Sequence, residues 1–378
     1  MHAFAVATLL AAHGLAPGGI DALVDSSGAL RGVILTYGIV VYTDDDVPLW
    51  VCEEATGEDG IPRGGVALDD GTLIVVGPRK GLFVSDDLGC SWRSVPALAE
   101  LIVTGVRRDA EGRVVFSTRD PRAAAIVGLL DAETLEVEVL ASFDAAIVES
   151  FVSDGARVAA ALTGVGDGGA RFVIVDDGGT REIATNDASV TALSVDESGV
   201  ILAAVEEGGE FVVREISAGD TLSPLALARF PARPRAILRF DGEVFASTSE
   251  GVLRGESEGS LSVVLDEFAS CLVGSVAGVL TCASGRDREV LVVRDALASG
   301  FTTATVRPRA CAEGTRAHDV CPAIWDLIHS SQAIGRELPA LDDDDEVPTC
   351  AHTDSGRAVP RASLVLAILV ATRSRRRR

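Results

Sequence analysis

Short apolar segments alternate with polar turns along most of the chain. In residues 66–95, four runs rich in Val, Ile, Leu and Phe are separated by turns that contain Gly, Asp and Pro. Runs of this length and composition are typical of β-strands. Between residues 20 and 308, no window shows sustained apolar spacing at i, i+3, i+4 and i+7, so helices are not expected there. The pattern predicts an all-β fold built from units of four short strands.

A second regularity is a turn glycine that follows a short apolar run and precedes a β-rich one. It recurs at Gly28, Gly71, Gly112, Gly155, Gly199, Gly242 and Gly278. Successive members are 43, 41, 43, 44, 43 and 36 residues apart, and such a period is typical of propellers or solenoids. We therefore predict a seven-bladed β-propeller of four-stranded antiparallel blades over residues 18–308, with six or eight blades as alternatives. The first unit contains a full set of strands, so the pattern does not show how the ring closes.

Two turns share one spacing of polar and aromatic residues. Segment 81–95 reads GLFVSDDLGCSWRSV and holds this spacing at Ser85, Asp87, Gly89 and Trp92. The same register occurs one unit earlier, with Val47 where glycine is expected, at Thr43, Asp45 and Trp50. Short polar side chains can hydrogen-bond nearby backbone amides, and glycine tolerates a positive φ. We predict a hairpin turn at each place, after which a tryptophan opens the next strand and packs there.

This spacing, S/T-x-D-x-G-x-x-W, resembles the Asp-box of BNR-type, sortilin-like and photosystem-assembly-factor-like β-propellers. The match in the second turn is complete, and the first turn lacks only the glycine. The resemblance implies a propeller in which these turns are structural. Asp45 and Asp87 are therefore expected to contribute to stability rather than to function.

The amino-acid composition and net charge limit the kinds of partner that the protein is expected to bind. The chain has 378 residues, 47% of them hydrophobic, which suffices to bury a sizeable core in one repeating domain. Its formal net charge of −23 is unfavourable for binding nucleic acid or anionic membrane, since both require Lys and Arg to neutralise phosphate. The acidic segment 341–347, LDDDDEV, is interpreted as a solvated linker, with a weak divalent-cation site as the alternative.

The N-terminus predicts export. Residues 1–12 form an apolar run of signal-peptide length that ends in small residues. The run lacks the usual Lys or Arg near its start, so an unexported chain is the alternative. Seven cysteines support export, because disulfides persist in oxidising compartments.

Six of these cysteines suggest pairs. Cys271 and Cys282 flank a hairpin symmetrically, so they should face each other across two strands. Cys311 and Cys321 enclose a short segment after the last unit and are expected to close a local loop, which makes residues 309–335 a disulfide-closed cap. Cys52 and Cys90 are expected to link neighbouring blades. Metal binding is the competing interpretation, but no CxxC or HxxxH pattern occurs.

The seventh cysteine, Cys350, lies in an acidic and polar linker, residues 336–361. It precedes a tail, residues 362–378, with an apolar run and an arginine cluster. The arrangement resembles the MYXO-CTERM sorting tails of myxobacterial surface proteins, and the whole chain resembles exported myxobacterial propeller proteins. That resemblance implies a sorting protease, processing or lipidation at Cys350 and display at the cell surface. The apolar run of ten residues spans only about 15 Å, half a bilayer core. A disordered basic tail is the alternative.

Catalysis is not predicted. Asp-boxes also occur in sialidases, which use a tyrosine nucleophile, but Tyr37 and Tyr42 are better explained as strand residues. The histidines all lie outside the predicted ring, so a serine or cysteine nucleophile inside it would lack its usual base. They are His2, His13, His318, His329 and His352. Lys80, the one lysine, lies in a turn, and no phosphate-binding glycine motif occurs, so no cofactor is expected.

The sequence therefore predicts an exported or cell-surface propeller that acts as a binding or scaffolding module for an unknown protein or glycan ligand. It contacts a membrane only through its tail. Two alternatives remain open: a glycoside hydrolase of the Asp-box propeller type, and a structural envelope protein. Propellers present loops on a rigid ring, on which recognition can be built.

Overall fold

The computed structural model describes residues 19–330 with short gaps. These gaps fall at 44, 46, 59, 110, 120–123, 166–168, 186–188, 197, 218, 256–260, 267–268, 276–277, 284–289, 295–296 and 302–305. The chain divides into two units, residues 1–337 and 338–378, and everything below concerns the first. The expected leader (1–12), linker (336–361) and tail (362–378), with Cys350, lie outside the described residues.

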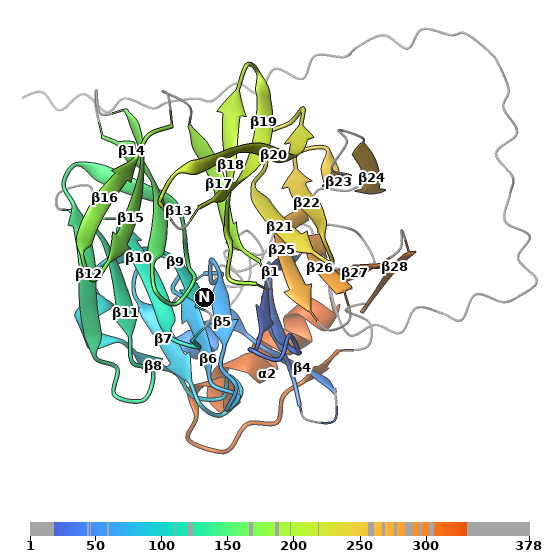
Figure 1. Ribbon diagram of the computed structural model, residues 1–378. Helices are drawn as coiled ribbons and strands as arrows, with labels where there is room; N and C mark the ends of the chain where they lie inside the picture. The colour runs from blue at the N-terminus through green and yellow to red at the C-terminus, as the bar shows by residue number, and fades with distance from the viewer. Residues whose placement is uncertain are drawn as a thin grey trace, which may run out of the picture. The chain divides into compact units, whose positions relative to one another are not determined.

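The described part is built almost entirely of antiparallel sheets (Figure 1). The first sheet contains β1 (Gly19–Val24), β2 (Leu30–Leu35), β3 (Gly38–Tyr42), β4 (Pro48–Val51) and, far along the chain, β29 (Arg307–Pro308). The second contains β5 (Gly65–Ala67), β6 (Leu73–Val76), β7 (Leu82–Ser85) and β8 (Arg93–Ser94). The third contains β9 (Ile102–Arg108), β10 (Val114–Arg119), β11 (Ala125–Leu130) and β12 (Val137–Phe143).

The remaining sheets repeat the same meander. The fourth contains β13 (Ala146–Ser153), β14 (Val158–Gly164), β15 (Ala170–Asp176) and β16 (Gly179–Ile183). The fifth contains β17 (Val190–Val195), β18 (Ile201–Glu207), β19 (Glu210–Ile216) and β20 (Leu222–Phe230). The sixth contains β21 (Ala236–Phe240), β22 (Glu243–Thr248), β23 (Gly251–Gly255) and β24 (Leu261–Leu265). The last contains β25 (Ala269–Ser275), β26 (Gly278–Ala283), β27 (Val290–Arg294) and β28 (Leu297–Phe301).

The prediction of an all-β propeller with four-stranded antiparallel blades is confirmed, but the prediction of seven such blades is wrong. Six sheets have four antiparallel strands each. The first sheet instead has five strands and is mixed, because β29 pairs in parallel with β4 through Arg307 opposite Leu49 and Pro308 opposite Trp50. The hydrophobic pattern could not reveal this addition, since a two-residue strand has no periodicity of its own.

The first strand of each sheet contacts the first strands of the two neighbouring sheets. These contacts form a closed cycle that runs β1, β5, β9, β13, β17, β21, β25 and back to β1. The ring is closed where β25 and β26 contact β1, and there the Ser270 hydroxyl donates a hydrogen bond to the Gly19 carbonyl at 2.7 Å. Closure therefore combines direct packing of the last sheet on the first with the added strand β29.

The recurrent glycines lie at one position of the repeat, in the connection between the first and second strands of each sheet or, for Gly278, at the first residue of the second strand. All of them have a positive φ, from 79° to 129°, which explains the residue type. Aspartates precede several of these turns, and Asp25, Asp109 and Asp196 each accept two backbone amides of the turn at 2.8–3.0 Å. The period in the sequence is thus the period of this turn.

Polar contacts at these turns also join neighbouring sheets. Asp69 accepts the backbone amide of Ser26 at 2.8 Å and a guanidinium hydrogen bond from Arg108 at 3.0 Å, so it links three consecutive sheets. Further round, Arg157 pairs with Asp220 at 2.9 Å. The interior between sheets is apolar; Phe172 and Ile174 pack with Ile201, for example. Burial of these faces drives assembly, and the turns fix the register.

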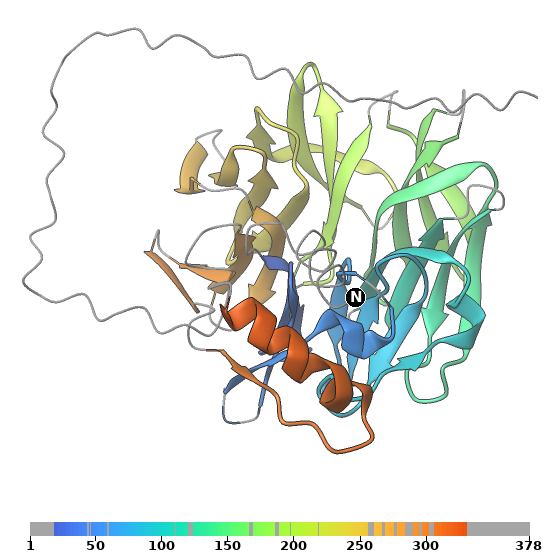
Figure 2. The same cartoon turned by 180° about the vertical axis from the view of Figure 1, so that it is seen from behind.

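Residues after the last sheet return to the first two sheets. The segment 306–330 forms β29 and helix α2 (Arg316–Ser330). The helix packs on η1 (Glu53–Thr56), a 3-10 turn that follows β4, and the view from behind shows it lying across this part of the molecule (Figure 2). A second 3-10 turn, η2 (Pro96–Leu98), follows β8. Within the described residues, no helix has the length and apolar character of a membrane span.

The described residues contain three disulfides, and two of them differ from the expected pairing. Cys271 bonds Cys282 across its hairpin. The expected local loop between Cys311 and Cys321 and the expected link between Cys52 and Cys90 are both wrong. Instead Cys52 bonds Cys321 and Cys90 bonds Cys311, with Cα atoms 5.3 and 5.5 Å apart. The reason is that α2 docks on η1, which brings Cys321 to Cys52 and leaves Cys311 beside the turn that follows β7.

Candidate functional site

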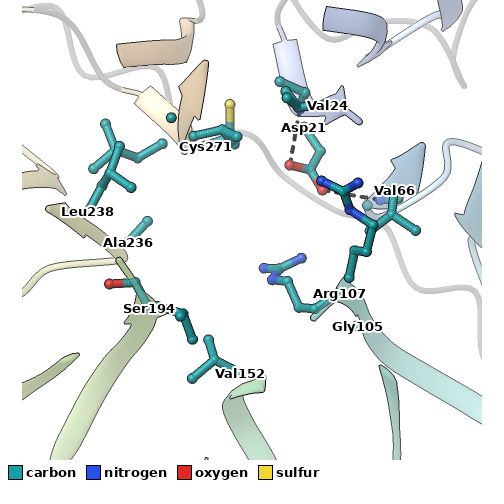
Figure 3. Close-up of a pocket in the computed structure, with 18 of the residues that line it drawn as sticks. Asp21, Val24, Val66, Gly105, Arg107, Val152, Ser194, Ala236, Leu238 and Cys271 are labelled. Atoms are coloured by element: carbon teal, nitrogen blue, oxygen red, sulfur yellow. Dashed lines mark hydrogen bonds between the residues drawn. The ribbon is translucent and has the colours of Figure 1, made fainter. Parts of the chain in front are cut away.

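The ring of first strands encloses a central cavity of about 890 Å³, and we refer to it as the channel. Its wall combines strand residues with the turns that follow them, and Figure 3 shows residues from several sheets pointing into it, among them Asp21, Arg107, Ser194 and Leu238. Cavities of this size hold small-molecule or chain-end ligands in other proteins. The channel is therefore the candidate site.

A second cavity of about 310 Å³ adjoins the channel. The two share four lining residues: Thr104, Gly105, Arg107 and Arg235. The rest of the smaller cavity's lining comes from the third, fourth and fifth sheets and combines the apolar side chains of Ile147, Val148 and Phe151 with polar groups, namely Ser117, Arg119, Glu149, Ser150 and Thr191. We refer to it as the side pocket. Hydroxyl and guanidinium groups dominate its polar lining, which suits a ligand rich in acceptor oxygens.

Three of the carboxylates that line the channel belong to the turn aspartates and are already occupied. Besides its two turn amides, Asp25 holds Arg31 at 2.6 Å, Asp109 holds Arg113 at 2.8 Å, and Asp196 lies 3.5 Å from Arg239. Burial acts to raise the pKa of Asp25, but hydrogen bonds from the Ser27 hydroxyl, the Arg31 guanidinium and a turn amide together hold it below its usual value. These carboxylates stabilise the ring, and their oxygens are committed to it.

The fourth lining carboxylate, Asp21, has a different environment. Its two oxygens accept the backbone amides of Gly65 at 3.1 Å and Ala22 at 3.0 Å, so it joins the first strands of two sheets. Burial raises the pKa of Asp21 above its usual value, although the charge of Arg107 and these two amides act in the opposite direction. Figure 3 shows Arg107 beside Asp21 at the channel wall.

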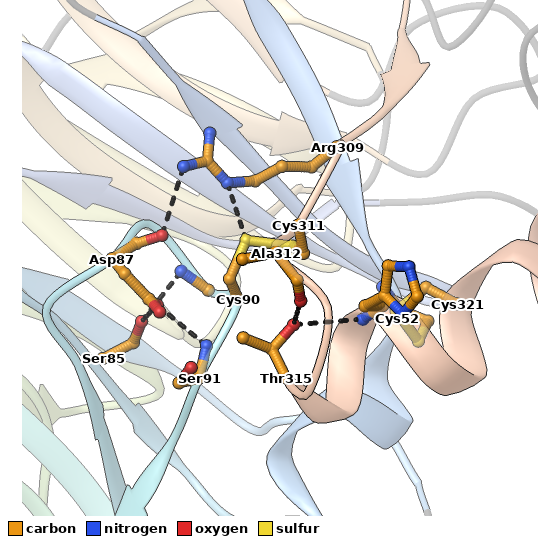
Figure 4. Close-up of a disulfide and its surroundings, with 12 residues drawn as sticks. Cys52, Ser85, Asp87, Cys90, Ser91, Arg309, Cys311, Ala312, Thr315 and Cys321 are labelled. Atoms are coloured by element: carbon orange, nitrogen blue, oxygen red, sulfur yellow. Dashed lines mark hydrogen bonds between the residues drawn. A yellow bond between two sulfur atoms is a disulfide. The ribbon is translucent and has the colours of Figure 1, made fainter.

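The residues that the sequence singled out lie away from the channel. In the turn after β7, the Ser85 hydroxyl donates to the Asp87 carboxylate at 2.9 Å and accepts the Gly89 amide at 2.8 Å, while Asp87 also accepts the Ser91 amide at 2.8 Å. The Trp92 indole donates to the Gly89 carbonyl at 2.9 Å. Figure 4 shows this turn beside the Cys90–Cys311 disulfide. The contacts are those of a structural turn.

Arg309 ties the C-terminal segment to the same turn. Its guanidinium donates to the Asp87 carbonyl at 3.2 Å and to the Cys90 sulfur at 3.2 Å (Figure 4). We expect Asp87→Ala to remove the carboxylate contacts and lower the free energy of unfolding by about 0.5 to 1.5 kcal/mol. Chemical denaturation of the oxidised protein measures this, and Asp86→Ala, an exposed neighbour, is the matched control. An unchanged midpoint for Asp87→Ala would contradict the structural role of the turn.

The earlier turn retains part of this arrangement. The Thr43 hydroxyl accepts the Val47 amide at 3.2 Å. The exposed Asp45 lies in the turn itself. Trp50 is buried and donates its indole N–H to the Tyr37 carbonyl at 2.9 Å. Tyr37 is buried as well, and Tyr42 packs against the same cluster. Neither tyrosine lines the channel or the side pocket.

Other candidates from the sequence are also peripheral. Lys80 pairs with Glu100 at 2.7 Å in an exposed contact. His318 lies on α2 beside Asp319, also exposed. In the part of the chain that the structure describes, no group of His, Cys, Asp and Glu could hold a metal ion. His2, His13 and His352 lie outside the described residues, as does the side chain of His329.

No pattern in the sequence distinguished the arginines of the channel and the side pocket. Arg63 precedes β5, Arg107 lies on β9, Arg119 ends β10 and Arg235 precedes β21. Each occurs in a different context and the chain holds many arginines. A signal did exist in the turn aspartates, because Asp25, Asp109 and Asp196 each lie three positions before a recurrent glycine, a spacing that marks a turn whose carboxylate holds backbone amides.

A buried carboxyl group also lies outside the channel, beneath α2. Glu53 in η1 is only 2% exposed. Burial, together with the adjacent charge of Glu54, raises the pKa of Glu53 to about 8. The folded protein therefore keeps a proton that the unfolded chain releases near pH 4.5. Between these values, rising pH favours the unfolded chain.

We expect Glu53→Gln to flatten the pH dependence of stability. The wild-type free energy of unfolding should fall as pH rises from about 4.5 to 8, by up to about 1.4 kcal/mol per pH unit. The variant removes the titrating group, so its advantage over wild type should be absent near pH 4 and largest near pH 8. Thermal denaturation at a series of pH values measures this, with Glu133→Gln, an exposed turn residue, as control. Parallel curves for wild type and Glu53→Gln would contradict the expectation.

Comparisons with known proteins identify the fold but no family to which the chain belongs. No family model matches the chain, and no curated protein matches it. Among solved structures, it is similar to virginiamycin B lyase from Staphylococcus aureus (12% identity, TM-score 0.50, 71% of this chain and 92% of that one). It is also similar to oligogalacturonate lyase from Vibrio parahaemolyticus (12%, 0.51, 72% and 89%) and to the Dos1 propeller (9%, 0.50, 76% and 86%).

One further match is to the extracellular domain of a hybrid two component system from B. thetaiotaomicron, at 12% identity and a TM-score of 0.49. The match covers 72% of this chain and 39% of that structure, so this chain spans about two fifths of the length of that structure. At such identities the similarities show the β-propeller fold alone. The fold by itself does not decide between catalysis and binding.

Proposed function

We propose that the protein is an exported, non-catalytic binding or scaffolding module that holds its ligand in the channel. The observation that carries the proposal is the channel itself, about 890 Å³ of space whose wall is supplied by the rigid inner strands of the ring. A wall made of paired strands is preorganised, so a ligand would not have to order it on binding. A protein or glycan segment, or a small molecule, has the size to enter.

The chemistry of the wall supports binding over hydrolysis. A glycosidase needs two carboxyl groups with free oxygens flanking the scissile bond. The turn aspartates Asp25, Asp109 and Asp196 use their oxygens for turn amides and arginines. Asp21 uses both of its oxygens for backbone amides. Because their oxygens are already hydrogen-bonded within the protein, these carboxylates are not free to act as a nucleophile or a general acid.

Export and surface display are part of the same proposal. The three disulfides suggest that the protein folds in an oxidising environment outside the cytosol. The turn of Ser85, Asp87, Gly89 and Trp92 has the contacts that the Asp-box resemblance implies, which supports membership of that class of propellers. The leader and the tail with Cys350 would supply export and attachment, the tail through a sorting protease of the MYXO-CTERM type.

A ligand screen with a blocked channel tests the binding function. Ala236 is a half-buried residue of the channel wall, and Ala236→Trp places an indole in that space. Ala97→Trp, on the exposed turn η2, is the matched control. The full oxidised chain is screened against glycan and metabolite panels, with thermal denaturation to confirm that both variants fold.

The outcomes separate binding from catalysis. We expect a ligand that binds the wild type and Ala97→Trp, loses at least about tenfold in affinity for Ala236→Trp, and is recovered chemically unchanged. Conversion of the ligand, seen as a mass change after incubation, would establish an enzyme instead. Equal affinity of the blocked variant would place binding outside the channel and contradict the proposal.

A further inference from the structure

Several guanidinium groups meet at the channel and its side pocket. Arg63 lines the channel, Arg107 and Arg235 line both cavities, and Arg119 lines the side pocket. The polypeptide brings them together through the ring. Arg235 directly precedes the innermost strand β21, Arg63 lies two residues before the innermost strand β5, and Arg119 lies opposite Ile102, the first residue of the innermost strand β9. Arg107 comes from the other end of β9, one residue before its last.

These arginines differ from others of the described chain in their partners. On other surfaces, Arg157, Arg181 and Arg214 each form ion pairs with carboxylates. Within the described residues, the side chains of Arg63 and Arg119 form no hydrogen bond or ion pair, and Arg107 donates only to its neighbouring carbonyl of Val106 at 2.9 Å. Each guanidinium has five N–H donors, so most of the donors of these three arginines remain available to hydrogen-bond a ligand.

The carboxyl groups that line the two cavities do not pair with these arginines. Asp25, Asp109 and Asp196 hold turn amides and other arginines, and both oxygens of Asp21 accept backbone amides. The remaining lining carboxyl group, Glu149, is exposed in the side pocket and forms no ion pair in the described residues. Arg63, Arg107 and Arg119 are exposed to the cavities as well, so their guanidinium donors can reach a ligand.

Hydroxyl groups complete the lining of the side pocket. Thr104 and Ser117 hydrogen-bond each other at 2.7 Å, and Ser150 accepts the Leu193 amide at 3.2 Å. Planar guanidinium groups with hydroxyls nearby are the donors that carboxylate and phosphate oxygens accept in proteins. The side pocket, of about 310 Å³, has room for such a group while the rest of the ligand extends into the channel.

We propose that the channel ligand carries anionic oxygens, as carboxylate or phosphate groups, and that Arg63, Arg107 and Arg119 bind them. This inference rests on the binding function proposed above and adds the chemical class of the ligand. The arginines hold the anionic end in and beside the side pocket. The mixed polar and apolar wall of the channel contacts the remainder.

Titration calorimetry with two small anions tests the inference on the full oxidised chain. The probes are citrate for carboxylates and pyrophosphate for phosphates, at low ionic strength so that screening does not mask the contacts. The test variant is Arg107→Gln with Arg119→Gln. Its matched control is Arg79→Gln with Arg171→Gln, since these two arginines line neither cavity and form no ion pair in the described residues.

We expect at least one probe to bind the wild type, to lose about tenfold or more in affinity for the test variant, and to change less than about twofold for the control. Preference for citrate would identify carboxylate as the group, and preference for pyrophosphate would identify phosphate. Absence of binding by both probes, or equal affinity of test variant and wild type, would overturn the inference. If a neutral ligand still binds and is excluded by Ala236→Trp, the proposed function stands while this inference falls.

Discussion

Replacing both Cys52 and Cys321 with Ser is expected to lower the free energy of unfolding by about 2 to 5 kcal/mol. The bond joins residues 269 apart in sequence and anchors α2 to η1, which lies at the end of the first sheet. It constrains the unfolded chain, and in the folded protein it helps to hold the strand that extends the first sheet. Because Cys90–Cys311 still closes a loop with a sequence separation of 221, the loss should be smaller than loop length alone suggests.

The matched control is the short disulfide. Cys271→Ser with Cys282→Ser opens a loop with a sequence separation of only 11, inside one hairpin, so we expect a smaller loss. Chemical denaturation of both double variants and the wild type gives the three values. A larger loss for the hairpin pair than for the long-range pair would contradict the view that the C-terminal segment stabilises the ring.

Trp50→Ala is expected to cost about 3 to 5 kcal/mol, the usual range for a buried tryptophan. Trp50 is 1% exposed, its ring centroid lies 5.4 Å from that of Trp325 on α2, and its indole donates to Tyr37. It also fills the space beside Gly38, where a Cβ atom would lie 2.5 Å from its Nε1 atom. The single side chain thus packs β3, β4 and α2 together.

Trp92→Ala is the comparison, because Trp92 occupies the equivalent place after the second turn but is only partly buried and has one indole hydrogen bond. Its loss should be clearly smaller, and both are measured by chemical denaturation. Equal effects at the two positions would show that α2 contributes little to the burial of Trp50. A loss below about 1 kcal/mol for Trp50→Ala would contradict the packing described here.

The fold was largely predictable because each repeat carries its own turn residues close together in the sequence. The recurrent glycines have positive φ at one turn of each sheet, so their spacing reported the repeat directly. The number of four-stranded sheets was not predictable in the same way, since the first sheet gains β29 from more than 250 residues downstream. The hairpin pair Cys271 and Cys282 follows from register alone. The other two disulfides depend on how α2 docks, which no local pattern records.

The candidate site was not predictable, and the reason is physical. Arg63, Arg107, Arg119 and Arg235 come from three sheets and meet only because the ring brings their strands together. The two turns with matching Ser or Thr, Asp and Trp residues could be recognised in the sequence because all of their residues lie within eight positions of one another. In the structure those side chains satisfy backbone amides and fill the core, away from both cavities.

Binding at the centre of the ring can be observed in a crystal structure of the full oxidised chain, soaked with the tighter-binding of citrate and pyrophosphate at about ten times its measured Kd. We expect density for the anion in the side pocket, with its oxygens within about 3 Å of the guanidinium groups of Arg107 and Arg119. An anion bound elsewhere on the surface, with the channel and side pocket unoccupied, would contradict the claim that this ring binds its ligand at its centre.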